Sequence, residues 1–356
     1  MRYKLFGHTG LRVSELCLGT MTFGEGWGWG SSREESCAVF DAFVAAGGNF
    51  FDTADVYTGG DSERLLGDFV RGQRERCVVA TKYSASIPTE GAQAHPLTSG
   101  NSRKHLMDAV HASLQRLNMD YIDILWVHCW DFLTPVEEVM RGLDDLVRTG
   151  KVCYVGVSNA PAWVVAKANT LAGQRGWTPF SGLQLKYNVL DRDIEPEFLP
   201  LARDLDLAIT AWSPLAGGVL SGKYQRDDVA ATADSKRAAL YADSLPARAW
   251  AVAEALSAVA AECDATASQV ALAWLRQRDP RVIPVIGART VAQLEDNLGS
   301  VELSLSADQL ARLSALAPPA LPFPHDLLHS PEQIQRSYGG YLEHIDQHRP
   351  RLFPLD

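Results

Sequence analysis

The chain has 356 residues, of which 46% are hydrophobic and 21% charged, and its formal net charge is −10. This composition is typical of a globular enzyme, and the absence of a block of Lys and Arg argues against nucleic acid as a partner. No apolar run approaches the roughly 18 residues of a membrane helix, and the first residues do not resemble a leader peptide. We therefore expect a cytoplasmic protein with no membrane partner.

From the N-terminus onward, short apolar runs alternate with stretches of helical period. The opening segment 3–16 reads as a hairpin around a His-Thr-Gly turn. Eight β-branched or aromatic runs follow, at 16–24, 49–57, 77–83, 121–129, 152–159, 182–188, 207–215 and 282–288. The clearest helical stretches between them are 32–48, 62–72, 102–119, 135–151 and 267–278. Eight such units predict an α/β fold of the (β/α)8 TIM barrel type, with an open doubly wound sheet as the alternative.

We expect one domain over residues 1–356, with the barrel at about 3–316 and a C-terminal tail at 317–356. The N-terminal hairpin would close the bottom of the barrel. Segments 84–101 and 216–245 are longer than a typical connection and follow strands, so they should lie over the active-site face. For the tail, a lid, an oligomer contact and a simple surface wrap all stay open.

The cysteines and histidines do not have the spacing of a metal site. No CxxC pair occurs among Cys17, Cys37, Cys77, Cys129, Cys153 and Cys263. In a chain of this size, they read as reduced thiols of the core. His344 and His348 have helical i,i+4 spacing, but no third ligand lies nearby in the sequence, so a solvated helix face is the simpler interpretation. We expect no metal.

Polar, titratable residues stand at the ends of consecutive apolar runs. They are Asp52, Tyr57, Lys82 and His128. Taken singly, each has an ordinary structural explanation, such as a loop cap or a buried ring. In a barrel, however, the strand ends face one mouth, so the four would become neighbours. A tyrosine with an ordinary pKa of about 10 needs a nearby cation to act as an acid near neutrality, and Lys82 would supply that cation with Asp52 as its counter-ion.

The motifs around these residues resemble, in order, those of the aldo-keto reductase superfamily. They are LGTMTFG, FDTADVYTGGDSERLLG, ATKY, IDILWVH, GVSN, AWSPLAGGVLSGKY and IPVIGARTVAQLEDNL. The resemblance covers roughly residues 3 to 316, and within the superfamily the chain is similar to bacterial reductases and potassium-channel β-subunits. It implies an oxidoreductase that reduces small-molecule aldehydes or ketones with NADP(H) by direct hydride transfer.

The resemblance also implies roles for the four residues. Tyr57 is the general acid, Lys82 its partner, Asp52 the support of Lys82, and His128 the group that orients the carbonyl. The channel subunits resemble the family with asparagine at the histidine position, so His128 favours an enzyme over the alternative of an NADP(H)-binding regulatory subunit. A second alternative is a metal-assisted hydrolase or lyase on the same fold, because fold alone does not determine function. It would need a cluster of His and carboxylate groups on several strand ends, and only His128 and Asp52 qualify.

Two glycine-rich segments fail as phosphate-binding motifs. GEGWGWG at 24–30 does not have the GxGxxG spacing, and GGVLSGKY at 217–224 has Tyr224 where a P-loop needs Ser or Thr. GART at 287–290 begins the helix after the last strand, where free N–H groups and Arg289 suit a 2′-phosphate. NADPH is therefore favoured over NADH, although dual use stays open.

By resemblance, the cofactor is held along the mouth of the barrel. Trp212 would stack on the nicotinamide, Ser158, Asn159 and Gln184 would hold its carboxamide, and Ser213 and Leu215 would line the diphosphate. The adenosine end would meet Gln293, Asp296 and Asn297. The remaining expected contacts are Thr20, Met21, Asp52, Pro214, Gly217, Lys223 and Gly287.

The substrate pocket is expected to include Trp27, Trp29 and Tyr83. Aromatic walls suit apolar or aromatic carbonyls, but they also occur in sugar sites, so aldehydes, ketones and sugars all stay open. The direction of the reaction and a homo-oligomeric state are not predicted from the sequence.

Overall fold

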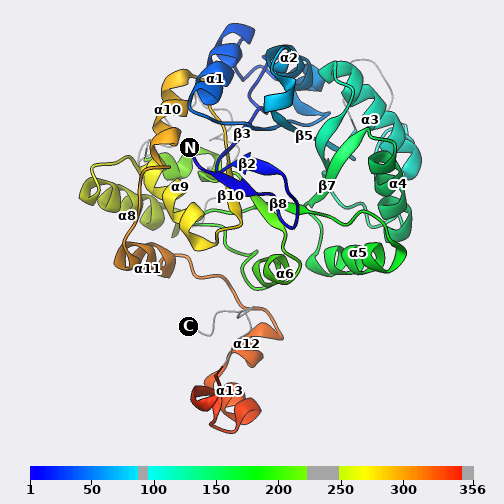
Figure 1. The fold of residues 1–356 in the computed structure, drawn as a ribbon. Coiled ribbons are helices and arrows are strands. Elements are labelled where there is room, and N and C mark those ends of the chain that lie inside the picture. The colour runs from blue at the N-terminus through cyan, green and yellow to red at the C-terminus, as the bar shows by residue number, and fades with distance from the viewer. Residues whose placement is uncertain (87–94, 223–247, 347–356) are drawn as a thin grey trace.

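The computed structural model describes residues 1–86, 95–222 and 248–346, and its centre is a closed barrel of eight parallel strands (Figure 1). Neighbouring strands follow chain order, and β10 pairs with β3 to close the ring. The strands are β3 (Cys17–Gly19), β4 (Phe50–Asp52), β5 (Val78–Tyr83), β6 (Ile122–Val127), β7 (Val152–Ser158), β8 (Gly182–Lys186), β9 (Ala208–Trp212) and β10 (Val282–Ile286). Each lies within a predicted run, so the barrel prediction is confirmed and the open sheet was wrong.

Helices surround the barrel on its outside (Figure 1). Those of the barrel units are α1 (Arg33–Ala45), α2 (Asp61–Val70), α3 (Arg103–Leu117), α4 (Val136–Arg148), α5 (Ala162–Arg175), α6 (Phe198–Asp204), α8 (Arg248–Glu262), α9 (Ala267–Arg278) and α10 (Val291–Gly299). Short 3-10 helices are η1 (Tyr57–Gly60), η2 (Arg74–Arg76) and η3 (Ala216–Ser221). All five helices predicted from periodicity are present.

Polar side chains begin several of these helices. Ser32 before α1 and Thr266 before α9 each form a capping box, with Glu35 and Gln269 returning the bond. Each box satisfies two backbone N–H groups that a helix start would otherwise leave without a partner. These residues explain why the helices begin where the sequence pattern predicts.

The N-terminal hairpin forms the floor of the barrel, as predicted. Strands β1 (Tyr3–Leu5) and β2 (Arg12–Ser14) pair antiparallel, and Phe6 in the turn packs edge-on against Phe50 and Trp126 of the barrel interior. The Trp126 ring leaves no room for a side chain at position 156 of β7, because a Cβ at Gly156 would lie 2.3 Å from the ring. Large rings therefore fill the lower interior of the barrel.

The described part of the C-terminal tail stands off the barrel. After α11 (Ala307–Ala315), the chain forms α12 (His325–Leu328), α13 (Pro331–Tyr338) and η4 (Leu342–His344), and Figure 1 shows α12 and α13 projecting beyond the helical ring. In these residues the tail is neither a lid nor a surface wrap. The predicted long loops fall partly on 87–94 and 223–247, and His348 of the predicted pair falls on 347–356, all outside the described residues.

All six cysteines are free thiols, as predicted, but they are not all in the core. Cys17 and Cys77 are buried, whereas Cys129 and Cys153 are exposed. The prediction of core thiols was wrong for this exposed pair, because Cys129 lies in a loop after β6 and Cys153 near the start of β7. None of the helices in the described part of the chain has the length and apolarity that a membrane span requires.

Candidate active site

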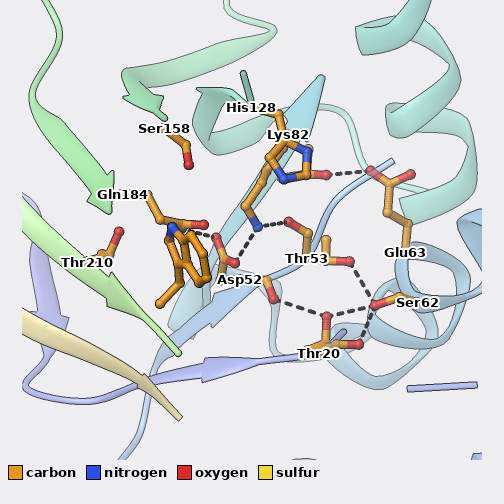
Figure 2. A network of polar contacts seen from close by, with 12 residues as sticks. Thr20, Asp52, Thr53, Ser62, Glu63, Lys82, His128, Ser158, Gln184 and Thr210 are labelled. Carbon is orange, nitrogen blue, oxygen red and sulfur yellow. Dashed lines mark hydrogen bonds and ion pairs between the residues drawn. The ribbon is translucent and has the colours of Figure 1, made fainter. Parts of the chain in front are cut away.

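A buried ion pair lies at the upper end of the barrel interior. The Lys82 Nζ of β5 is 2.5 Å from Asp52 Oδ2 at the end of β4, and it also donates to the backbone oxygen of Thr53 at 2.7 Å (Figure 2). Lys82 is fully buried and Asp52 is 3% exposed. Burial works against the ammonium, but Asp52 and Tyr57 outweigh it and raise the pKa of Lys82. The lysine is therefore a cation at neutral pH inside the barrel.

Tyr57 lies next to this cation, in the turn that follows β4. Lys82 Nζ is 4.8 Å from the centroid of the Tyr57 ring, and the His128 ring meets the tyrosine edge-on at 6.1 Å. The turn requires unusual backbone angles, since Thr58, Gly59 and Gly60 all have positive φ. The four residues predicted from strand ends are thus brought together in one mouth.

His128 is an uncharged imidazole in this setting. Burial, followed by the positive charge of Lys82, lowers the pKa of His128 to about 3. Its backbone is fixed on both sides, because its N–H donates to Tyr83 O and its carbonyl accepts from Asn159 Nδ2. Within the described residues its Nδ1 is buried with no hydrogen-bond partner. A neutral ring can offer an N–H to a carbonyl oxygen without adding charge.

Three hydroxyl groups join the ends of β3 and β4 to α2. Ser62 Oγ lies 2.8 Å from both Thr20 Oγ1 and Thr53 Oγ1, and it donates to the Thr20 carbonyl at 2.7 Å (Figure 2). Thr20 is expected to contact the cofactor, but its own hydroxyl is engaged in this cluster. Sequence reasoning missed Ser62 and Thr53, because an isolated hydroxyl in a sequence gives no sign of its partners.

A third missed residue is Glu63, which is fully buried on α2. Its carboxylate accepts from Thr81 Oγ1 at 2.6 Å and from Arg116 Nε of α3 at 2.5 Å. The sequence did indicate that Glu63 is buried, because it shares the apolar face of its helix with Leu66 and Val70, at helical spacing. A carboxylate on a buried helix face needs a charged partner inside the protein.

The expected nicotinamide contacts border the ion pair. Gln184 Nε2 donates to Asp52 Oδ1 at 2.8 Å, so this amide holds the counter-ion of Lys82 (Figure 2). Asn159 is exposed, and its Oδ1 accepts from Trp212 Nε1 at 3.3 Å. Its Nδ2 also bonds to the buried Ser158 at 2.9 Å. Trp212, Asn159 and Ser158 therefore form one bonded group beside the mouth.

The expected diphosphate contacts follow β9 in a tightly turned segment. Ser213 and Gly217 have positive φ, and Gly217 N donates to Ser213 Oγ at 3.1 Å. Pro214 and Leu215 lie between them, and Met21 is half-buried at the end of β3. Lys223 falls outside the described residues, so its predicted contact with the cofactor stays a prediction.

The start of α10 has the features of an anion site. Thr290 caps the helix by accepting from Gln293 N, and the exposed Arg289 precedes it. A Cβ at Gly287 would meet no atom within 4 Å, so the space before the helix is open. Asn297 is buried and bonds to the Gly287 carbonyl at 3.4 Å, whereas Asp296 accepts from Thr266 at 2.8 Å.

The expected substrate residues separate into two groups. Trp27 and Trp29 lie 5.3 Å apart by ring centroids, and Trp27 meets Tyr57 edge-on at 6.3 Å. Tyr83 is not part of this group. It is 1% exposed and packs beside His105 of α3, because neighbouring strand residues point to opposite faces and Lys82 takes the inner one.

Comparisons with known proteins identify a family and relatives of this chain. A family model described as "Aldo/keto reductase family" matches residues 15–318. The chain is 38% identical to the aldo-keto reductase ausK and 40% identical to the norsolorinic acid reductase stcV of Emericella nidulans, in each case over 92% of this chain and 84% of the relative. It is 39% identical to the aryl-alcohol dehydrogenase (NADP+) of Phanerodontia chrysosporium, over 89% of this chain and 86% of the relative.

Proposed function

Because the chain belongs to the aldo/keto reductase family, we propose that it reduces an aldehyde or ketone to an alcohol with NADPH, using Tyr57 as the general acid. The observation that carries the proposal is the meeting of Tyr57, Lys82 and His128 in the barrel mouth. His128 favours an enzyme over the regulatory alternative, since the channel subunits resemble the family with asparagine at this position.

Each residue has a separate task in the proposed reaction. Tyr57 gives its hydroxyl proton to the alkoxide that develops from the carbonyl, and the Lys82 ammonium stabilises the tyrosinate that is left. Asp52 keeps Lys82 charged and oriented, with Gln184 as its second partner. The neutral His128 ring orients the carbonyl oxygen through an N–H.

The residues present fit a dinucleotide phosphate. A bound NADPH would supply the hydride that reduces the carbonyl carbon. Trp212 and Asn159 border the mouth where a nicotinamide would lie, and the open, positively charged start of α10 suits the phosphate of the adenosine end. Arg289 is the residue that we expect to favour the 2′-phosphate over a bare ribose.

We also propose an aromatic carbonyl as the substrate. Trp27 and Trp29 stand beside Tyr57, where they would contact the body of a substrate whose carbonyl meets the tyrosine. Aromatic pairs prefer stacked or edge-on contacts, which a flat ring can make. The name of one relative, an aryl-alcohol dehydrogenase, supports an aromatic substrate over a sugar.

Substitution of the tyrosine tests the proposal. Tyr57→Phe removes the proton donor but keeps the ring, so we expect kcat to fall by about 10²-fold or more while the Kd of NADPH stays within about twofold of wild type. Turnover is measured as loss of NADPH absorbance with substituted benzaldehydes and aliphatic aldehydes, and binding as quenching of tryptophan fluorescence.

Two results would contradict the proposal. A wild-type protein that binds NADPH but reduces none of these carbonyls would support the regulatory alternative. A Tyr57→Phe variant that keeps its turnover would show that the proton comes from another group. Tyr341→Phe is the matched control, since Tyr341 is exposed on the projecting tail.

A further inference from the structure

A buried acid that the proposed chemistry does not use lies two residues before Tyr57. Asp55 is 1% exposed, in the turn that connects β4 to η1. Its backbone N–H donates to the carbonyl of Lys82 at 3.3 Å, and Tyr57 N donates to the carbonyl of Ala54 at 3.2 Å. The turn that holds the Asp55 side chain therefore also determines where the tyrosine stands relative to the lysine.

The charged groups around Asp55 cannot neutralise it. Glu63 of α2 takes the Arg116 guanidinium of α3, and the remaining nearby cation, Lys82 of β5, is already paired with Asp52. An ionised Asp55 would thus be a second buried anion near Glu63, and the Arg116 guanidinium is already paired with Glu63. Like charges in a buried site disfavour the charged form of one partner.

The hydrogen bonding of Asp55 agrees with this electrostatic argument. Its Oδ1 is buried and accepts no hydrogen bond within the part of the chain that the structure describes. A buried carboxylate oxygen without a donor is costly, whereas a protonated carboxyl carries less charge to solvate. Burial and then Glu63 raise the pKa of Asp55 to about 8, and Arg116, the backbone N–H of Val56 and Lys82 offset only part of this. The carboxyl is therefore mostly protonated at pH 7.

We propose that Asp55 is a positioning residue for Tyr57: protonated, it holds the 53–57 turn in place, and its ionisation in the alkaline range displaces the tyrosine from Lys82. The proton lost in this step goes to solvent water. The role rests on the proposed function of Tyr57, but the protonation state of Asp55 does not depend on that function.

The isosteric variant Asp55→Asn separates this proposal from a structural role. The amide keeps the shape of the protonated acid and cannot ionise, so we expect kcat at pH 7 within about twofold of wild type and an unchanged KM. Tyr57 and Lys82 also lose protons at high pH, so the informative quantity is the difference between the two profiles. Above pH 8 the variant should keep a kcat that the wild type loses.

Asp68→Asn is the matched control, because Asp68 lies on α2 in surface ion pairs with Arg33 and Arg71. Its profile should follow that of wild type. The proposal is overturned if Asp55→Asn loses most of its kcat at pH 7, which would mean that the charged carboxylate is needed, or if its alkaline decline coincides with that of wild type.

A direct titration gives a readout without turnover. With carbon-13 in aspartate carboxyls, the wild type should show one signal that titrates near pH 8 and is missing from Asp55→Asn; Asp55→Ser serves as the second assignment variant if the first does not fold. A signal showing Asp55 ionised at pH 7 would overturn the proposal even in an active enzyme. If Asp55 is protonated but the protein has no reductase activity, the proposed function is wrong, whereas the inferred protonation state of Asp55 still holds.

Discussion

His128 and Lys82 share the barrel mouth, yet their surroundings act on their charges in opposite directions. Both lose hydration on burial, which disfavours the cation. Lys82 has a carboxylate at 2.5 Å and keeps its charge, whereas His128 has no such partner and faces the lysine ammonium. The site thus holds the Lys82 cation next to the neutral His128 ring. In the proposed reaction, the cation would stabilise the tyrosinate, and the neutral ring would orient the carbonyl oxygen.

The neutral histidine predicts a specific response to acid. Because the folded-state pKa of His128 is about 3, its ring should stay uncharged down to about pH 4, and kcat should show no His128-dependent decline between pH 7 and 5. The free energy of unfolding, in contrast, should fall as the pH drops from about 6.5 toward 3, because the unfolded state binds the proton that the folded state excludes.

The measurement compares wild type with His128→Gln between pH 5 and 8, by kcat and by urea unfolding. The two kcat profiles should be parallel, and the variant should lose less stability at low pH. A decline of the wild-type kcat with a midpoint near 6.5 that is absent from His128→Gln would show that the ring is charged and contradict the prediction.

At the scale of elements, the strand ends were predictable and the side-chain partners were not. Asp52, Lys82 and His128 end apolar runs, and the parallel barrel brings such positions together whatever the loops do. Tyr83 was misplaced because an apolar run without alternation does not tell which face of the strand a residue takes. The Glu63–Arg116 pair joins residues 53 positions apart, and only the packing of α2 on α3 places them in contact.

The start of α10 is the element on which cofactor choice is expected to depend. A 2′-phosphate there would meet the helix N-terminus and the Arg289 guanidinium, and a charge-assisted hydrogen bond contributes about 1.5–3 kcal/mol. Arg289→Ala should therefore raise the Kd of NADPH by about tenfold or more and that of NADH by less than about twofold.

Titration of tryptophan fluorescence with each cofactor measures both constants. Arg248→Ala, at the start of α8, is the control for loss of one positive charge. Equal weakening of NADPH and NADH binding in Arg289→Ala would mean that the arginine supports the site structurally rather than selecting the phosphate.

At the scale of the whole molecule, aromatic rings close the lower interior of the barrel, and the Lys82–Asp52 ion pair lies at its upper end. The hairpin and the Trp126 layer fill the lower interior, so the ion pair of Lys82 rests on a packed apolar floor. This arrangement places the Lys82–Asp52 pair at the end where the loops after the strands meet. The predicted cytoplasmic location and the single-domain boundaries stay predictions.

The projecting tail contrasts with this compact body. Its described residues expose large apolar side chains: Leu321, Phe323, Leu327, Leu328, Tyr338, Tyr341 and Ile345. One polar contact between the described tail and the barrel is the His325–Glu197 pair at 2.6 Å, in which the His325 side chain is 16% and the Glu197 side chain 56% exposed. A partly exposed pair contributes about 1 kcal/mol or less to stability, so we expect the tail to stabilise the barrel little.

Deletion of residues 318–356 tests this independence. The cut preserves α11 and the carbonyl of Ala317, which accepts from Arg192 at 3.2 Å, so the anchor of α11 to the barrel stays intact. We expect the unfolding temperature to stay within about 3 °C of wild type, and the shortened chain to associate less because it loses exposed apolar side chains. Calorimetry and light scattering at several protein concentrations measure both effects. A fall of about 10 °C that also appears at the lowest concentration would show that the tail stabilises its own barrel, since a contribution from a second copy would disappear on dilution.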